Sequence, residues 1–370
     1  MRLNDAVEVL RSLAPERLSE DWDNVGLLVG DPSWRLRRAL LCIDLTESVL
    51  AEAIEQKADL IVAYHPPIFS ALPALTSADL KQRIILAAAS RRIAIYSPHT
   101  ALDSAPAGVN DWLAQGIGPG VIRALRPLRD AVETAYKLVT FVPHEVADSL
   151  RTALASTGAG QIGDYTSCSF GSHGEGTFVG GNSTKPAIGR RGHLERVAEL
   201  RLEMVCGSGQ LADVVAALRK AHPYEEPAFD LYRLEPTPID ATVGQGRVIV
   251  LHRSLSVPTL VRRLKKHLGL RQLEVAVPDP MRPLVQVAVC AGAGGSLLEH
   301  AGPIDAFVTG EMRHHQVLAA CADGVTVILA GHSQTERPYL PVYRDRIVQL
   351  LGQKVMWSIS TVDRPPCVKM

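Results

Sequence analysis

The sequence has few of the features that mark secreted, membrane or nucleic-acid-binding proteins. Its 370 residues include only 6 cysteines, scattered without a CxxC pair, which favours small core residues over a disulfide framework. Lysine plus arginine and aspartate plus glutamate both number 39, so there is no basic footprint for nucleic acid or anionic lipid. No apolar run reaches membrane-spanning length, and the first residues lack the apolar core of a signal peptide. We therefore expect a cytoplasmic protein without a direct nucleic-acid or membrane partner.

The composition is that of a globular protein with several domains. Hydrophobic residues make up 46% of the chain and charged residues 21%, which is enough to bury a sizeable core. A length of 370 residues exceeds that of one ordinary domain, so two or three are expected. Strand and helix patterns alternate in the first and last thirds of the chain, which predicts α/β structure there.

Histidine and acidic side chains follow four of the predicted strands, where each strand ends. In α/β sheets, this strand-to-helix edge is the usual place for chemistry. Two of the pairs are predicted at the start of a helix, with Ser333 as the N-cap of the last one, so that four-residue spacing brings imidazole and carboxylate to one side of a turn. The residues are His65 after 59–64, His99 with Asp103 after 92–96, Glu311 with His315 after 305–309, and His332 with Glu336 after 325–330.

Each of these residues alone is more often structural than functional. His332 could cap a strand, and Glu336 could simply favour a helix N-terminus. In a nearby acidic loop, Asp23 could orient a neighbouring group or only stabilise a turn through its side chain. Four such strand ends in a chain with 12 histidines favour a metal site instead, because imidazole with carboxylate suits Zn, Mn or Fe.

The middle of the chain has another pattern. The predicted order is β-α-β-β-α-β, which is the order of a ferredoxin-like module, with one long loop at 180–193. A Pro-Thr-Pro segment at 236–238 marks its end. Its segment 222–228, His-Pro-Tyr-Glu-Glu-Pro-Ala, admits two interpretations. His222, Glu225 and Glu226 could bind a ligand, or they could form a polar turn between a helix and an edge strand.

These motifs, in this order, resemble those of the GTP cyclohydrolase 1 type 2 homolog family, also called NGG-interacting-factor-three-like proteins. The resemblance covers nearly the whole chain, and the middle module resembles the PII/CutA-like insertion of the longer members. The segments that carry it are Asp21–Leu27, His65–Phe69, His99–Asp103, Thr309–His315 and Gly331–Glu336.

The resemblance implies an architecture and a cofactor. Two related α/β lobes, 1–130 and 237–370, would form one metal-binding body that is interrupted by a ferredoxin-like, PII/CutA-like α+β insertion at 131–236. The subunits would assemble as a ring-shaped homohexamer. Each subunit would hold two divalent metal ions, Zn, Mn or Fe, in a dinuclear centre that faces the interior.

The resemblance also implies the ligands of that centre. His65 and His332 would bind one ion and Asp103 the other, and Glu336 would bridge both. The chain departs from the family at Tyr64, because many members have two adjacent histidines where this chain has Tyr64-His65. A phenol, with a reference pKa of about 10, is a poorer ligand than imidazole unless the metal lowers its pKa. The second ion, beside Asp103, therefore depends on Tyr64.

Two functions follow from this interpretation. The first is a metal-dependent hydrolase, with His99 and His315 as general acid or base because imidazole titrates near neutral pH. The family name implies opening of the purine ring of GTP. The second is a non-enzymatic metal-binding scaffold or regulator that binds partner proteins or small effectors through its insertion. Turnover that is lost in Glu336→Ala would support the enzyme.

Overall fold

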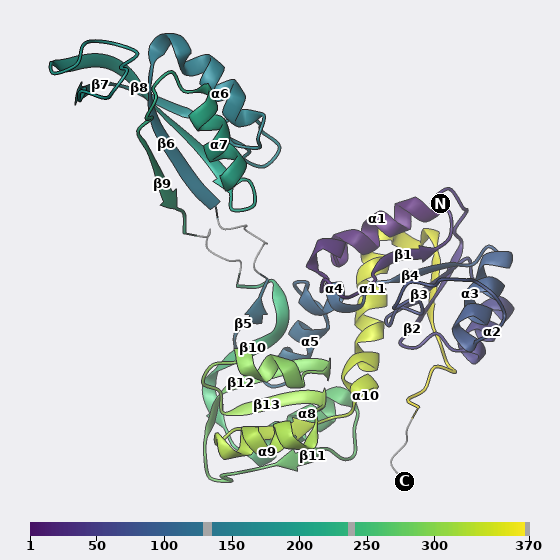
Figure 1. Ribbon diagram of the computed structural model, residues 1–370. Helices are drawn as coiled ribbons and strands as arrows, with labels where there is room; N and C mark the ends of the chain where they lie inside the picture. The colour runs from purple at the N-terminus through teal and green to yellow at the C-terminus, as the bar shows by residue number, and fades with distance from the viewer. Residues whose placement is uncertain (129–134, 236–240, 367–370) are drawn as a thin grey trace. The chain divides into compact units, whose positions relative to one another are not determined.

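The computed structural model describes residues 1–128, 135–235 and 241–366 (Figure 1). The chain forms two compact units, one of Met1–Leu128 with Asp240–Met370 and one of Arg129–Ile239. The fold is mixed α/β, with three sheets in the described residues. No helix in that part of the chain combines the length and apolar composition needed to cross a membrane.

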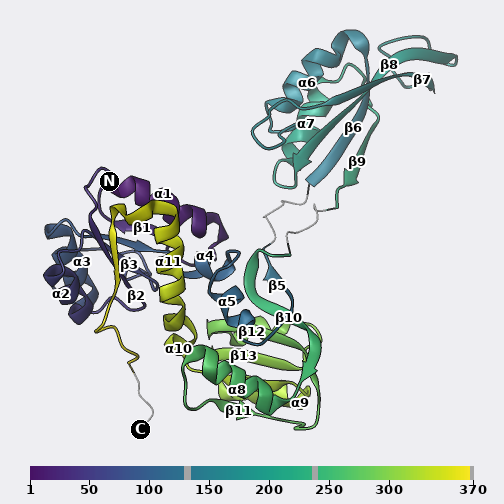
Figure 2. The ribbon, with the colours of Figure 1, turned by 180° about the vertical axis from the view of Figure 1, so that it is seen from behind.

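The first sheet of the larger unit has five strands and is parallel except for β1. Its central strands are almost entirely buried, because helices cover both faces (Figures 1 and 2). Helices α1 (Leu3–Leu13) and α11 (Leu340–Leu351) pack on one face, and α2 (Glu47–Glu55) and α3 (Leu80–Ser90) on the other. In sheet order the strands are β1 (Gly26–Val29), β4 (Ala94–Ser97), β3 (Leu60–Ala63), β2 (Arg38–Cys42) and β15 (Met356–Ile359).

The second sheet of the larger unit has six strands, of which the three central ones, β12, β13 and β14, run parallel. Helices α5 (Val109–Gln115) and α8 (Val257–Leu268) cover one face, and α9 (His314–Ala322) covers the other. In sheet order the strands are β11 (Glu274–Ala276), β14 (Thr326–Leu329), β13 (Ala306–Glu311), β12 (Leu284–Ala293), β10 (Gly244–Leu255) and β5 (Gly120–Pro127).

Each sheet contains strands from both ends of the chain. Strand β5 comes from the N-terminal segment and pairs with β10, whereas the C-terminal strand β15 pairs with β2. One continuous cluster of buried apolar side chains runs from the first sheet to the second, through α1, α5, α8 and α11. Residues 1–128 and 241–366 therefore fold around a shared core, which fixes the strand ends of one sheet against those of the other.

Two local predictions near the strand ends are wrong. Ser333 does not cap a helix, because the short helix α10 (His332–Glu336) already begins one residue earlier, after Gly331. Gly331 adopts φ +91°, a conformation that favours glycine, so the chain turns there. Glu311 does not begin a helix either. It is the last residue of β13, held there by pairing with Ala293, and α9 begins at His314.

The smaller unit is a four-stranded antiparallel sheet with two helices, in the predicted β-α-β-β-α-β order. The strand order is β7-β8-β6-β9, and the helices bury the apolar core against one face. Along the chain the elements are β6 (Ala135–Pro143), α6 (Ala147–Ala155), β7 (Phe170–Val179), β8 (Leu194–Gly207), α7 (Leu211–Ala221) and β9 (Phe229–Arg233).

Candidate metal centre

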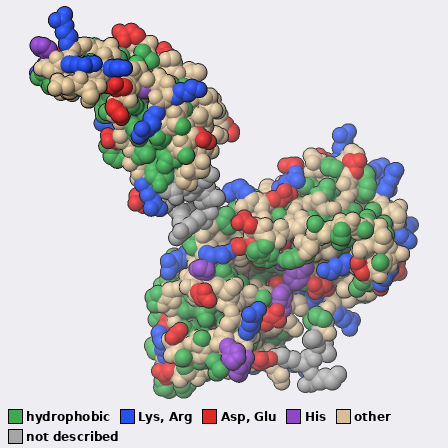
Figure 3. All heavy atoms as spheres, in the orientation of Figure 1, with side chains coloured by type: hydrophobic (Ala, Val, Ile, Leu, Met, Phe, Trp, Pro, Cys, Tyr) green, Lys and Arg blue, Asp and Glu red, His purple; other side chains and the backbone are tan. Residues whose placement is uncertain are grey.

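His65, His332 and Glu336 lie together in the larger unit, with one ligand atom of each within 4.8 Å of the others. His65 follows β3 of the first sheet, and His332 and Glu336 lie on α10, which follows β14 of the second. The His65 Nε2 is 3.5 Å from Glu336 Oε2, and the His332 Nε2 is 3.3 Å from Glu336 Oε1. Histidine and acidic side chains lie side by side near the middle of this unit's surface (Figure 3).

A second carboxylate orients each of the two imidazoles. The His65 Nδ1 lies 2.9 Å from Asp44 Oδ1, and the His332 Nδ1 lies 2.9 Å from Glu311 Oε1. An Nδ1–H that donates to a carboxylate fixes the tautomer, so that the Nε2 lone pair is free to bind a metal. Both Nε2 atoms face the same carboxylate, that of Glu336. This is the arrangement that supports metal-binding histidines in proteins.

The donors fit a divalent metal ion. Glu336 is only 4% exposed, and among the described residues its Oε2 makes no well-formed hydrogen bond, with His65 Nε2 3.5 Å away, which is costly for a buried carboxylate. Gly292, at φ +65°, leaves the space in front of the donors open. A Cβ atom there would lie 2.7 Å from Glu336 Oε1 and 3.2 Å from His332 Nε2. Two nitrogen donors and one oxygen donor suit Zn, Mn or Fe.

The electrostatics of the cluster keep protons on the histidines until a cation replaces them. Burial lowers the pKa of His65, but its hydrogen bond to Asp44 and the nearby Glu336 carboxylate prevail and raise it to about 10. For His332, the hydrogen bond to Glu336 outweighs burial and raises the pKa to about 9. The same two imidazoles hold the pKa of Glu336 below its usual value, although burial opposes this. Metal uptake must therefore displace protons.

Tyr64 and Asp103 lie beside this cluster and satisfy each other. The Tyr64 hydroxyl donates a hydrogen bond to Asp103 Oδ1. Burial raises the pKa of Asp103 to about 6, and burial together with the Asp103 charge raises the pKa of Tyr64 well above its usual value. The pair is thus a neutral phenol and a carboxyl group, and not an imidazole with a free carboxylate.

His99 completes the neighbourhood, with its ring centroid 5.3 Å from that of His65. Its Nδ1 lies 2.7 Å from Asp23 Oδ1, while Asp23 Oδ2 accepts the backbone N–H of Thr100 at 3.1 Å. Asp23 also accepts the backbone N–H of Asn24, so it both orients a neighbour and closes a turn. His99 has φ +25°, a strained conformation for a non-glycine residue, and such strain collects at functional sites.

His315 stands apart from these residues. It is exposed on α9, with its ring 5.6 Å from that of His314. In the described part of the chain it makes no hydrogen bond or ring contact with the cluster. The expected pairing of Glu311 with His315 is wrong, because Glu311 ends β13 and its carboxylate holds His332 instead.

Sequence reasoning missed Asp44. It lies two residues after the end of β2, so it occupies the same kind of strand end that revealed His65 and His332. Applying the strand-end rule to acidic residues as well as histidines would have found it. The role of Asp23 was left open for a different reason. Its contact with His99 joins residues 76 positions apart in the chain, which no local pattern records.

Known proteins resemble this chain over nearly its whole length. A relative from Halalkalibacterium halodurans named "GTP cyclohydrolase 1 type 2 homolog" is 38% identical over 94% of this chain and 92% of its own length. Human "NIF3-like protein 1" is 35% identical over 99% of this chain and 92% of its own. The crystal structure of a Bacillus cereus protein related to NIF3 matches with a TM-score of 0.64 and 31% identity, and covers 100% of this chain and 99% of its own.

The family model described as Duf34/NIF3 (NGG1p interacting factor 3) matches residues 1–366. The match therefore includes all three residues of the cluster and both of the carboxylates that orient its histidines. The chain belongs to the Duf34/NIF3 family.

Proposed function

We propose that this protein is a metal-dependent hydrolase whose reaction centre is the cluster of His65, His332 and Glu336. The observation that carries the proposal is the Glu336 carboxylate, buried between two imidazoles, with one oxygen that makes no well-formed hydrogen bond to any described residue and has His65 Nε2 3.5 Å away. A site that only stabilised the fold would pair that oxygen with a donor, because an unpaired buried carboxylate is destabilising. A divalent cation satisfies it and both imidazoles at once.

The residues of this chain divide the chemistry between them. A bound divalent ion supplies a Lewis acid that polarises a carbonyl or phosphoryl oxygen and activates water. Asp23 holds the Nδ1 of His99, which leaves Nε2 of His99 to accept or donate a proton beside the cluster. We assign His99 as the general acid or base. His315, exposed on α9, is a weaker candidate for that role.

The centre is proposed to take two ions of unequal affinity. Asp103, with Tyr64 in place of an imidazole, would hold the second ion, and Glu336 would bridge. Before it can bind, the Tyr64–Asp103 hydrogen bond has to open, because the phenol hydroxyl occupies an oxygen of that carboxylate. The second ion is therefore expected to bind more weakly than the first.

The assembly and the domain assignment complete the proposal. Residues 1–130 and 237–370 are taken as two related lobes of one metal-binding body, interrupted by a PII/CutA-like insertion at 131–236. The chain is proposed to form a homohexamer in the cytoplasm. Light scattering of the purified chain tests the hexamer, since a monomer or dimer at micromolar concentration would contradict it.

The test of the function combines metal content with turnover. Protein loaded with Zn²⁺, Mn²⁺ or Fe²⁺ is assayed for hydrolysis of GTP, the substrate that the relatives' name indicates. Simple phosphate esters and simple amides are assayed in the same way. Glu336→Gln keeps the shape but should lose both metal and turnover. His99→Gln should keep the metal and lose turnover. His314→Gln, which changes an exposed histidine on α9, should keep both.

Two results would overturn the proposal. Turnover that persists in metal-free Glu336→Gln would place the chemistry elsewhere. Metal binding without any hydrolysis, in a protein that still captures a partner or effector regardless of Glu336→Gln, would favour the metal-binding scaffold instead. Equal turnover in His99→Gln would remove His99 from the mechanism and leave the metal cluster intact.

A further inference from the structure

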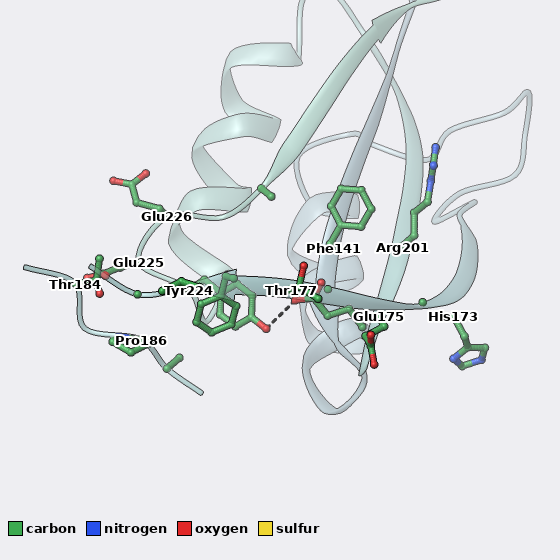
Figure 4. Close-up of a pocket in the computed structure, with 18 of the residues that line it drawn as sticks. Phe141, His173, Glu175, Thr177, Thr184, Pro186, Arg201, Tyr224, Glu225 and Glu226 are labelled. Carbon is green, nitrogen blue, oxygen red and sulfur yellow. Dashed lines mark hydrogen bonds between the residues drawn. The ribbon is translucent and has the colours of Figure 1, made fainter. Parts of the chain in front are cut away.

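The smaller unit contains a pocket of about 570 Å³, which the proposed hydrolase does not use. It lies between β7, the loop 180–187 and the turn at 224–228. In Figure 4, Glu225 stands at one end of the pocket and His173 at the other, with Tyr224 and Phe141 between them. This volume is in the range of small-molecule sites.

A buried carboxylate faces this pocket without a cationic partner. Glu199, on β8, is only 8% exposed, and its Oε1 accepts a hydrogen bond from the neutral hydroxyl of Tyr224 at 2.8 Å. Among the described residues, no lysine, arginine or histidine forms an ion pair with it. Its other oxygen lies against Gly176, where a Cβ atom would come within 2.2 Å, so the absent side chain leaves room for it. A buried carboxylate in this state is stabilised by an added cation.

Apart from Arg201, the other charged groups that line the pocket are carboxylates. Arg201 lines it, but its Nε donates to Glu203 Oε1 at 3.0 Å, outside the pocket. Glu225 accepts the backbone N–H of Lys185 at 2.7 Å, which ties the loop to the turn without neutralising the charge. Glu226 also lines the pocket and is exposed. The field inside the pocket therefore favours a cation over an anion.

Aromatic rings supply the apolar walls. The rings of Phe178 and Tyr224 are 6.5 Å apart and tilted by 54°, and Phe141 lines the same pocket. Ring faces attract cations, most strongly where the cation is shielded from water. His222 supports these two aromatic residues from behind and does not itself line the pocket. Its Nε2 donates to Phe141 O at 3.0 Å and its Nδ1 accepts the Tyr224 N–H at 3.1 Å, which makes it a neutral structural clamp.

We propose that the pocket of the smaller unit binds a small organic cation with a planar or apolar body. Its ammonium, amidinium or guanidinium group pairs with Glu199, and its body packs against Phe178 and Tyr224. The proposal goes beyond the hydrolase, because it concerns a different unit of the chain and needs no metal. It also answers which residues of the 222–228 motif contact a ligand, with Tyr224 at the centre and His222 behind it.

The test compares a cation with its neutral analogue on the full-length protein. Benzamidine and benzamide have the same shape and differ in charge. Calorimetric titration should give a dissociation constant of about 0.1–1 mM for benzamidine and a value at least about tenfold weaker for benzamide. Glu199→Gln, which retains an acceptor for Tyr224, should reduce benzamidine binding to the level of benzamide. Glu145→Gln, an exposed carboxylate of the same unit outside the pocket, should change nothing.

Two further variants keep the proposal open to refutation if Glu199→Gln fails to fold. Tyr224→Phe keeps the ring and removes the hydroxyl that competes for the carboxylate, so benzamidine should bind at least as tightly. Phe178→Leu removes one ring face and should weaken benzamidine by about threefold to tenfold. Equal affinity for both compounds overturns the proposal, and so does a benzamidine titration without heat up to about 10 mM. Binding of a lysine-rich peptide with no binding of benzamidine also overturns it, in favour of a protein partner.

Discussion

The two halves of the candidate metal centre use carboxylates in opposite ways. Glu336 is buried between two imidazoles that point their Nε2 atoms at it, and one of its oxygens makes no well-formed hydrogen bond with the described residues. Asp103 is also held at the site, but the hydroxyl of Tyr64 already donates to it. The pKa of Glu336 is lowered, whereas the pKa of Asp103 is raised to about 6.

This difference shows what prepares a carboxylate for a metal ion. A carboxylate that faces two protonated imidazoles keeps its negative charge. One divalent cation can then bind in place of the two protons on those imidazoles. A carboxylate that faces a neutral phenol in a buried place loses part of its charge, because burial disfavours the ionised form. The first half of the centre is therefore ready to bind, and the second must rearrange first.

The largest effect on metal binding is expected from filling the space in front of His332 and Glu336. Gly292→Ala would place a Cβ 2.7 Å from Glu336 Oε1 and 3.2 Å from His332 Nε2, so we expect metal binding to be lost. Gly352→Ala is the matched control. Its φ of +66° is close to the +65° of Gly292, but nothing lies within 4 Å of the added atom. Metal content by plasma mass spectrometry should fall only in Gly292→Ala. A similar loss in both variants would show that backbone strain, and not the occupied space, is responsible.

The next effect concerns the second half. Tyr64→His would replace the phenol beside Asp103 with a nitrogen donor, and we expect the tightly bound metal to rise from about one to about two equivalents per chain. Tyr64→Phe is the control, because it frees Asp103 without adding a donor and should stay near one equivalent. Two equivalents in the unmodified protein after dialysis against a weak chelator would show that Tyr64 is no obstacle.

The comparison also predicts how metal affinity depends on pH. In the metal-free protein the pKa values of His65 and His332 are raised to about 10 and about 9, so both are protonated at neutral pH. Binding then displaces two protons, and the dissociation constant should fall by about a hundredfold per pH unit between about pH 6 and about pH 8. The dependence should flatten as pH rises through the two pKa values. Co²⁺ titration followed by visible absorption measures this slope, and a slope near zero would mean that the imidazoles are already neutral.

The sequence could predict the first half of the centre better than the second. His65 and His332 each follow a buried strand, and Glu336 lies four residues after His332 on α10, so local patterns alone indicate all three. The Glu311–His315 pairing failed because one extra ladder pair, Ala293 with Glu311, keeps Glu311 in the strand. The strand extends two residues beyond its predicted end at Thr309, which is a tertiary effect that helix spacing does not reveal.

Other features could not be read from the chain at all. The exchange of β5 and β15 between the two sheets of the larger unit depends on long-range pairing that leaves no local signal. The two lobes that the family resemblance implies, 1–130 and 237–370, do not predict this exchange of strands. The hydrogen bond between Tyr64 and Asp103 joins residues 39 positions apart, so only the structure shows that the phenol occupies this carboxyl group.

The smallest effects are expected from the carboxylates behind the two histidines, and they should differ. Asp44→Asn removes the charge that holds His65 and should weaken metal binding by about tenfold to a hundredfold. Glu311→Gln should cost less, about threefold, because the Glu311 side chain is 60% exposed against 38% for Asp44 and water already screens its charge. Both substitutions keep an acceptor for the Nδ1–H, so ring orientation is retained and only charge is tested. Competition with a chelating dye measures both constants. A larger loss for Glu311→Gln would show that His332, the more exposed of the two imidazoles, depends more on its carboxylate than His65 does.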